Sequence, residues 1–345
     1  MALQPTTVTL NEFASWFNDT RYAIRAMQDD MLADPIFSIL GEDTSNNRSY
    51  VLSTTGYDYS GFAKAKTPGG PISRDAPVEA DQHSVYYVTF IKRFNYEREA
   101  ILHDQYNIID PGGTSALQQL WDGVGLFLTN CFWNYNTSTS FSVPEQNGTI
   151  TYANATPDAA AIVASTHSGP GYSSKTNIGG TGAFSGSTVV SNIDVGNQNC
   201  VTPAGIARAY QPDALVCAMG NAALREAMLQ YTRSDKVFSS GNNAVMVAPG
   251  AGMDVILLKH APRTNVGAFD TTAAKLHKWA TINKADFKKS MKYKWIERPT
   301  IVDGPTLDTD NLDTFRTATC RIAFMAENPW CMIQNNATSA PISAY

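Results

Sequence analysis

Charge and long apolar runs are both scarce in this sequence. Charged residues fill 17% of its 345 positions, whereas they fill roughly 25% of a typical soluble domain. Apolar runs such as 159–164 and 255–258 fall far short of the roughly 20 residues that a membrane-spanning helix needs. Residues 1–10 have neither the basic nor the apolar region of a secretory signal. We therefore expect a protein that is not secreted and has no membrane partner.

Cysteines are few and scattered, and no two of them form a CxxC pair. An odd, dispersed set favours reduced, buried thiols in a cytosolic environment over disulfides or a zinc site. The five are Cys131, Cys200, Cys217, Cys320 and Cys331.

The short signatures of catalysis are missing as well. The sequence has no GxSxG, HExxH or GxxxxGK[ST], and no GxGxxG that follows a strand. Its five histidines lie far apart, and His103-Asp104 is the best local acid–base pair. We predict no catalytic, cofactor-binding or metal-binding residue, so that the protein is not an enzyme. A cytosolic hydrolase whose active site is assembled from dispersed residues remains the alternative.

Neutral polar and aromatic residues take the place of charge. The buried centres of protein–protein interfaces have this bias, because charge is depleted there while Tyr, Trp and Met are enriched. A β-rich protein with a neutral surface has the same composition, so both interpretations stay open.

A long amphipathic helix is predicted over residues 114–132, after the turn sequence Asp110-Pro-Gly-Gly. Its apolar residues recur at helical spacing and form one stripe. They are Leu117, Leu120, Trp121, Val124, Leu128, Cys131 and Phe132. Gly123 and Gly125 weaken the helix and allow another segment to approach it closely.

A two-stranded ribbon is predicted between residues 51 and 98. Residues 51–66 lead outward, a Pro- and Gly-rich turn follows at 67–71, and residues 84–93 return. One face of the return strand holds Val85, Tyr87, Thr89 and Ile91, and the other holds Tyr86, Val88, Phe90 and Lys92. Both faces are largely apolar, so the strand needs cover on both. Either it is a central strand of an ordinary sheet, or neighbouring subunits cover it.

Other segments give shorter signals. A capping box at Thr9–Glu12 starts a helical arm, which Asp34-Pro35 ends. We predict short helices at 158–163 and 185–192, a helix start at Thr202-Pro203, strands at 214–218, 253–258 and 319–325, and a helix from Asn221 to Tyr231. Residues 275–298 hold eight basic and two acidic residues, a net charge of +6. This basic run forms either a solvated face or a contact with an acidic surface of a neighbouring copy.

The order of these elements resembles the HK97-like major capsid proteins of tailed bacteriophages over nearly the whole chain. An arm, a ribbon with a Pro/Gly tip, a long helix, a loop-rich stretch, a compact α/β block and a final strand follow one another. The stretches that carry the resemblance are 61–63, 85–94, 114–132, 162–168, 211–216, 221–231 and 313–324.

The resemblance implies an α+β subunit with four parts. Residues 1–50 would be the N-terminal arm, and 51–98 the extended loop, or E-loop. Residues 99–178 and 300–345 would form the peripheral domain, which contains the long spine helix. Residues 179–299 would form the axial domain.

The resemblance also implies a function and partners. The subunit would assemble into hexamers and pentamers of an icosahedral head that encloses double-stranded DNA. It would be made in the host cytoplasm and become part of the virion, with portal, scaffold and cement proteins as partners. Because the ribbon starts near residue 51, we expect a separate scaffold or none, and little maturation cleavage. Alternatives are an encapsulin-type nanocompartment with protein cargo and a tail component.

The candidate packing or intersubunit residues lie in the arm, the ribbon, the spine helix and the C-terminal segment. They are Leu10, Phe13, Phe62, Lys64, Lys66, Tyr86, Val88, Phe90, Trp121 and Trp330. In some shells of this kind a lysine near the ribbon tip forms an isopeptide bond, which gives Lys64 and Lys66 a second interpretation. Two solvated lysines are the simpler one.

Overall fold

The computed structural model describes most of the chain from residue 34 onward. The described residues are 34–45, 50–54, 57–59, 77–79, 82–96, 109–145, 148–202, 204–233, 252–301, 306–307 and 314–341. The predicted arm helix, which includes Leu10 and Phe13, and the ribbon turn at 67–71 lie outside these residues.

An elongated five-stranded sheet has at its centre a long strand that β18 (Met332–Asn335) follows in the chain. β17 (Thr314–Ala326) pairs antiparallel with β6 (Val88–Tyr96), from Ile322 opposite Val88 to Thr314 opposite Tyr96. It also pairs antiparallel with β15 (Met291–Ile301) and with β16 (Thr306–Leu307). The short β1 (Gly41–Glu42) lies parallel to β15 at the edge. The predicted strand 319–325 is confirmed and extends further in both directions.

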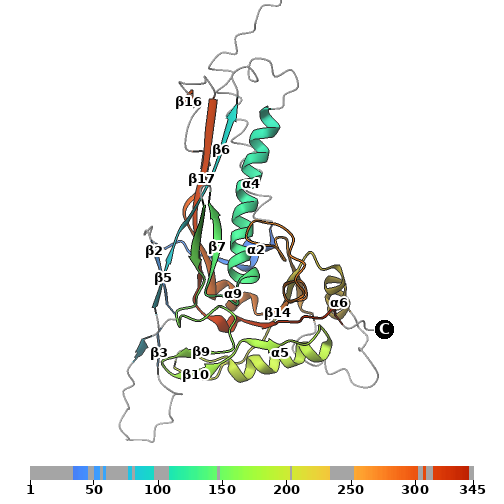
Figure 1. Ribbon diagram of the computed structural model, residues 1–345. Coiled ribbons are helices and arrows are strands. Elements are labelled where there is room, and N and C mark those ends of the chain that lie inside the picture. Colours follow the sequence, from blue (N-terminus) through green and yellow to red (C-terminus); the bar gives the residue numbers. More distant parts are fainter. Residues whose placement is uncertain are drawn as a thin grey trace, which may run out of the picture.

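The long helix α4 (Ile109–Thr129) runs along this sheet beside β6 and β17 (Figure 1). It begins five residues before the predicted start, because a proline in the first turn removes only an N–H that has no helical partner. A π-helical turn, Asn130–Asn134, continues it. Six of the seven residues of the predicted stripe are buried, and Leu117 has no described side chain. These six are Leu120, Trp121, Val124, Leu128, Cys131 and Phe132.

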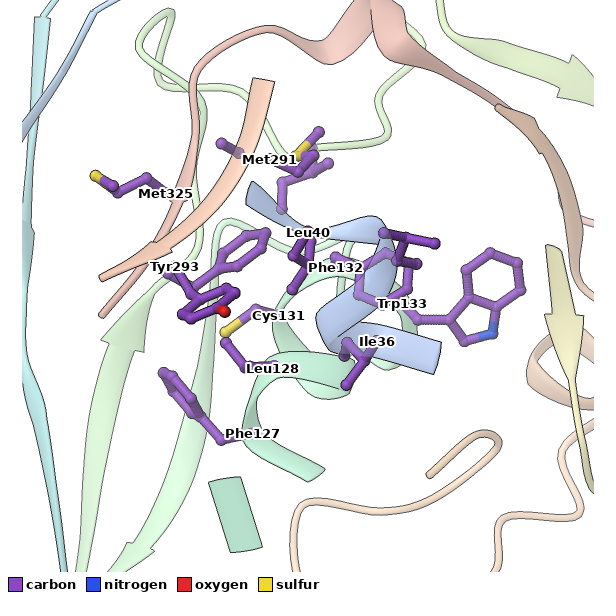
Figure 2. Packing of buried hydrophobic residues seen from close by; sticks show 14 of the residues in the cluster. Ile36, Leu40, Phe127, Leu128, Cys131, Phe132, Trp133, Met291, Tyr293 and Met325 are labelled. Atoms are coloured by element: carbon purple, nitrogen blue, oxygen red, sulfur yellow. The ribbon is translucent and has the colours of Figure 1, made fainter. Parts of the chain in front are cut away.

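The end of α4 packs on a short helix that the sequence did not predict. The helix predicted to end at Asp34-Pro35 lies outside the described residues. Asp34 caps α2 (Pro35–Ile39), accepting a hydrogen bond from the Ile36 amide. Figure 2 shows Ile36 and Leu40 of this segment among residues of α4, β15 and β17. Both are 1% exposed, and burying such a side chain contributes roughly 1.5–3 kcal/mol. Ile36 and Leu40 therefore belong to the core to which α4 contributes.

A second, compact sheet has the strand order β11-β18-β14-β12-β13. The strands are β11 (Ile178–Gly180), β18 (Met332–Asn335), β14 (Trp279–Ile282), β12 (Ala214–Ala218) and β13 (Asp254–Leu258). Leu215 and Cys217 of β12 join the cluster formed with α5 and α6, while Ala214 and Val216 join the core beneath α4. This explains why β12 is apolar on both faces.

The helices α5 (Gly186–Asn199) and α6 (Ala222–Arg233) confirm the helices predicted there, α5 being longer than expected. Ser185 and Thr188 form a capping box at α5. The Asn221 side chain accepts from the Leu224 amide at the start of α6.

The helix predicted at 158–163 is wrong. Ala159 has a φ of 60°, and Ala155 and Ala161 form an isolated bridge, so this segment folds as a tight turn. The helix start predicted at Thr202-Pro203 is also wrong, since the described residues 204–210 contain no helix.

The remaining elements are short. They are the hairpins β7 (Ser140–Glu145) with β8 (Gly148–Ala153) and β9 (His167–Gly169) with β10 (Tyr172–Lys175), the helices α8 (Ala273–Leu276) and α9 (Lys284–Ser290), and a 3-10 turn, Pro329–Cys331.

Candidate assembly surface

The predicted ribbon forms, but its return strand divides into two. β2 (Tyr50–Thr54) pairs antiparallel with β5 (Gln82–Tyr86), and β3 (Tyr57–Tyr59) pairs with β4 (Pro77–Glu79). The chain then leaves the ribbon at Tyr87 and continues as β6 in the elongated sheet. Figure 1 shows β2, β5 and β3 leading away from that sheet, on the side opposite α6.

The interruption at Tyr87 explains the two apolar faces that the sequence showed. Side chains alternate within a strand, and one residue outside the ladder shifts this alternation by one position. Val85 and Val88 therefore both point inward, with 3% and 4% exposure. Tyr86 and Ile91 both point outward, with 68% and 59% exposure. The hypothesis that neighbouring subunits cover both faces is wrong for Val85 and Val88, because the subunit's own core covers them.

Three of the other candidate residues also pack inside the subunit. Phe90 is half-buried and meets Phe127 edge to face, with ring centroids 5.6 Å apart. Trp121 meets Trp295 at 5.9 Å. Trp330 is 7% exposed, and the His167 ring lies 5.3 Å from it. These three side chains stabilise the fold of one chain. Leu10, Phe13, Phe62, Lys64 and Lys66 lie outside the residues with described side chains.

Three further exposed apolar side chains were not among the candidates predicted from the sequence. Met219, Val266 and Phe269 are 47%, 70% and 53% exposed. Phe269 lies against Gly220, where an added Cβ would come 2.5 Å from the ring. The signal that could have revealed them is the presence of valine and phenylalanine in a segment otherwise rich in Pro, Thr, Asn and Gly.

The segment that carries Val266 and Phe269 is held in place from several sides. The Arg263 guanidinium donates to the Gly267 carbonyl at 2.7 Å, and Arg263 and Phe269 form a backbone bridge. The Asn265 amide donates to the Tyr135 hydroxyl at 3.1 Å, and its side chain donates to the Ser142 carbonyl. These bonds present the exposed apolar side chains in a fixed geometry.

The basic run 275–298 is mostly neutralised within the chain. Five of its eight cations pair with an acidic residue of the same subunit: Lys275 with Asp270, Lys284 with Asp254, Lys292 with Glu327, Lys294 with Asp43 and Arg298 with Glu42. Lys288 and Lys289, which are exposed on α9, are therefore the residues of this run that could still contact an acidic surface of a neighbouring copy.

Lys278 is the buried member of the run. Its ammonium donates to the Trp133 carbonyl and, at 3.2 Å, to the Asn136 side chain, and it lies 5.0 Å from the centre of the Trp133 ring. Burial, with a smaller effect of Lys275, lowers the pKa of Lys278 to about 7. Lys278, which directly precedes β14, thus binds the Trp133 carbonyl in the π-helical turn and the Asn136 side chain just after it.

The described residues contain one close pair of catalytic type. His167 Nδ1 lies 2.9 Å from Asp158 Oδ2, and both side chains are buried. Asp158 also accepts from Thr156 and from the Ser168 amide, and these hydrogen bonds, together with His167, hold its pKa below the usual value despite the opposing effect of burial. The free ring nitrogen faces no hydrogen-bonding partner and the ring packs on Trp330, which is the environment of a structural histidine.

Candidate metal ligands and cysteines lie among the residues that the structure describes. No group of three His, Cys, Asp or Glu residues there has the geometry to hold a metal ion. All five cysteines are free and buried, as predicted, and burial raises the pKa of Cys200 to about 12. No helix among the described residues is both long and apolar enough to cross a bilayer.

Comparison with known proteins identifies the fold. No protein-family model matches the sequence, and no curated protein matches it significantly. Among solved structures, the capsid subunit of a native GTA particle is similar over 89% of this chain and 90% of its own, with a TM-score of 0.50 and 10% identity. The chain has an HK97-like capsid fold.

Two other structures are similar at lower scores. The capsid protein of Myoviridae phage XM1 has a TM-score of 0.48 and 10% identity, and covers 87% of this chain and 90% of its own. A virus-like particle from Pyrococcus furiosus has a TM-score of 0.41 and 12% identity, over 89% and 96%. The HK97-like capsid fold confirms the predicted α+β class; the boundaries of arm, extended loop, peripheral and axial parts stay predictions.

Proposed function

We propose that this chain is the repeating subunit of a closed icosahedral shell, a phage-type head built from its hexamers and pentamers. The observation that carries the proposal is the end-to-end match to the capsid subunit of the GTA particle, which leaves little of either chain unaccounted for. The role would be structural, without catalysis.

The two exposed apolar groups support the proposal. Tyr86 with Ile91, and Met219 with Val266 and Phe269, expose large apolar side chains that water solvates poorly. Tyr86 and Ile91 sit on paired strands, Val266 and Phe269 sit on the hydrogen-bonded 261–270 segment, and Met219 directly follows β12. Rigid apolar side chains lose little conformational entropy when a partner covers them, so they suit a surface that is buried on assembly.

The charge distribution supports a shell that encloses DNA without binding it tightly. The chain has a net charge of −5, and five of the eight cations in its basic run already have acidic partners. Lys288 and Lys289 remain for contacts with phosphate, which would be nonspecific and sensitive to salt. We propose double-stranded DNA as the content, the virion as the location and the host cytoplasm as the place of assembly.

The further partners are proposed from the requirements of such a shell. A portal would fill one vertex, and a separate scaffold would set the curvature during assembly. A cement protein would add contacts from outside. The ribbon residues Phe62, Lys64 and Lys66, together with the arm residues Leu10 and Phe13, remain candidates for contacts between subunits.

Electron cryomicroscopy of the purified full-length protein, expressed with and without its neighbouring phage genes, tests the proposal. We expect hollow icosahedral particles or capsomers, with DNA inside when the packaging machinery is present. Particles that hold only protein cargo would favour the encapsulin-type alternative, and rings or tubes would favour a tail component. A monomer with hydrolytic activity would favour the dispersed active site.

A further inference from the structure

A buried histidine lies where three segments of the subunit meet. His260 follows β13 and is 6% exposed. Its Nε2 is 3.6 Å from Asp34 Oδ2, at the cap of α2, and 3.8 Å from Asp122 Oδ1, on α4. No hydrogen-bonding partner satisfies this nitrogen. We refer to His260, Asp34 and Asp122 with their neighbouring cations as the His260 joint.

The helix α4 is shaped to admit the ring. A Cβ added at Gly125 would lie 2.9 Å from His260 Nε2 and 3.0 Å from Cδ2. Any other residue at position 125 would push the ring away from the helix. The backbone also holds the ring in position, because the Asn134 side chain donates to the His260 carbonyl at 3.2 Å.

The charges around the ring balance only while the histidine is neutral. Asp34 and Asp122 supply two negative charges, and Lys259 and Arg263 supply two positive ones. Lys259 already pairs with Asp122 at 2.9 Å. Burial is the main cause that lowers the pKa of His260. The carboxylates of Asp34 and Asp122 oppose this effect, whereas the cations of Lys259 and Arg263 add to it. A proton on the ring therefore adds one buried positive charge that the joint does not compensate.

We propose that protonation of His260 opens this joint, so that the start of α2 and the segment after β13 separate from α4 in acid. Opening exposes the protonated ring to water and so removes the desolvation penalty of burying its charge in a cluster whose other charges already balance. The sign agrees with linkage: a histidine whose pKa is lowered on folding destabilises the closed form as the pH falls below its unfolded value of about 6.5.

The joint connects α2, which follows residues 1–33, to the spine helix and to the compact sheet. Its opening would thus loosen three parts of the subunit at once. The effect belongs to the single subunit and does not depend on the proposed shell, so either proposal can fail without the other.

Hydrogen–deuterium exchange of the full-length chain at about pH 7.5 and about pH 5.5, corrected for the chemical exchange rate, tests this directly. In the wild type we expect severalfold faster exchange in α2 and in residues 259–263 at the lower pH. His260→Gln should show the same rates at both pH values. His277→Gln, a change of a half-buried histidine elsewhere, should retain the wild-type response.

Two further variants keep the test decisive if His260→Gln folds poorly. Lys259→Met removes a neighbouring cation from an exposed position, so the response to acid should shrink. Asp34→Asn keeps an oxygen to cap α2 but removes a compensating carboxylate, so the response should grow. Equal responses in all variants, or slower exchange in α2 at low pH, would overturn the proposal.

Discussion

Tyr86 and Val88 lie two residues apart on the returning side of the ribbon, yet Tyr86 is 68% exposed and Val88 is 4% exposed. In an uninterrupted strand they would share one face. The break at Tyr87 places Val88 opposite Ile322 in the elongated sheet and turns Tyr86 outward. One short stretch therefore holds both a residue that stabilises the subunit and a residue available to a neighbouring subunit.

The first prediction separates these two roles. Val88→Asp should destabilise the subunit by several kcal/mol, because it buries a carboxylate with no partner. Tyr86→Asp should change the free energy of unfolding by no more than about 0.5 kcal/mol, yet strongly reduce the yield of particles. Ser84→Asp, on the same exposed face of β5, is the control and should affect neither. Urea denaturation and particle yield on a sucrose gradient give the two measurements.

Two glycines of α4 should respond to alanine with opposite signs. At Gly123 a Cβ would meet only Phe90 Cδ1, at 4.0 Å, so the gain in helix propensity should stabilise the protein by up to about 1 kcal/mol. At Gly125 the Cβ would collide with the His260 ring, so Gly125→Ala should be destabilising. Thermal unfolding of the two variants checks this, and equal shifts in Tm would contradict the packing described.

Lys278 should make the free energy of unfolding increase with pH above 7, and replacing Lys278 should remove this increase. Its pKa is about 7 when folded and 10.5 when unfolded, so the unfolded chain binds more protons between these values. Stability conferred by Lys278 therefore rises with pH above 7. Relative to Lys278→Met, the wild type should gain about 2 kcal/mol in unfolding free energy from pH 7 to pH 8.5. Lys284→Met, at an exposed ion pair, should show no such trend.

Removing only one partner of the Asp43–Lys294 pair should lower the free energy of unfolding more than removing both partners. Lys294 is 3% exposed and its ammonium lies 3.4 Å from Asp43 Oδ2 and 3.0 Å from Ser45 Oγ. Asp43→Asn leaves a buried cation without its carboxylate and should cost about 3 kcal/mol. The double variant Asp43→Asn/Lys294→Met should recover most of that loss. A double-mutant cycle in urea measures the coupling, and additive losses would argue against a buried pair.

The sequence predicted those elements whose pattern is local. The apolar stripe of α4, the strand β12 with apolar residues on both faces, and the Asn221 cap of α6 all follow from spacing and capping. In the sequence Asp34-Pro35 indicates the end of a helix, although aspartate at the cap and proline in the first turn are also typical of a helix start. That alternative would have revealed α2.

Other features depend on contacts that sequence spacing does not encode. The break at Tyr87 has no proline or glycine to mark it, so the shift in alternation became visible only through pairing with β17. The His260 joint combines residues 34, 122 and 260, which are distant in the chain. The acidic partners of the basic run are likewise scattered, from Glu42 to Glu327.

The mass of the particle formed by the full-length chain tests the central claim most directly. Light scattering after size-exclusion chromatography, over a range of salt and protein concentration, measures it. The proposed shell predicts megadalton particles, or hexamers and pentamers that convert to them. A monomer under every condition would contradict the proposal that this chain builds a shell.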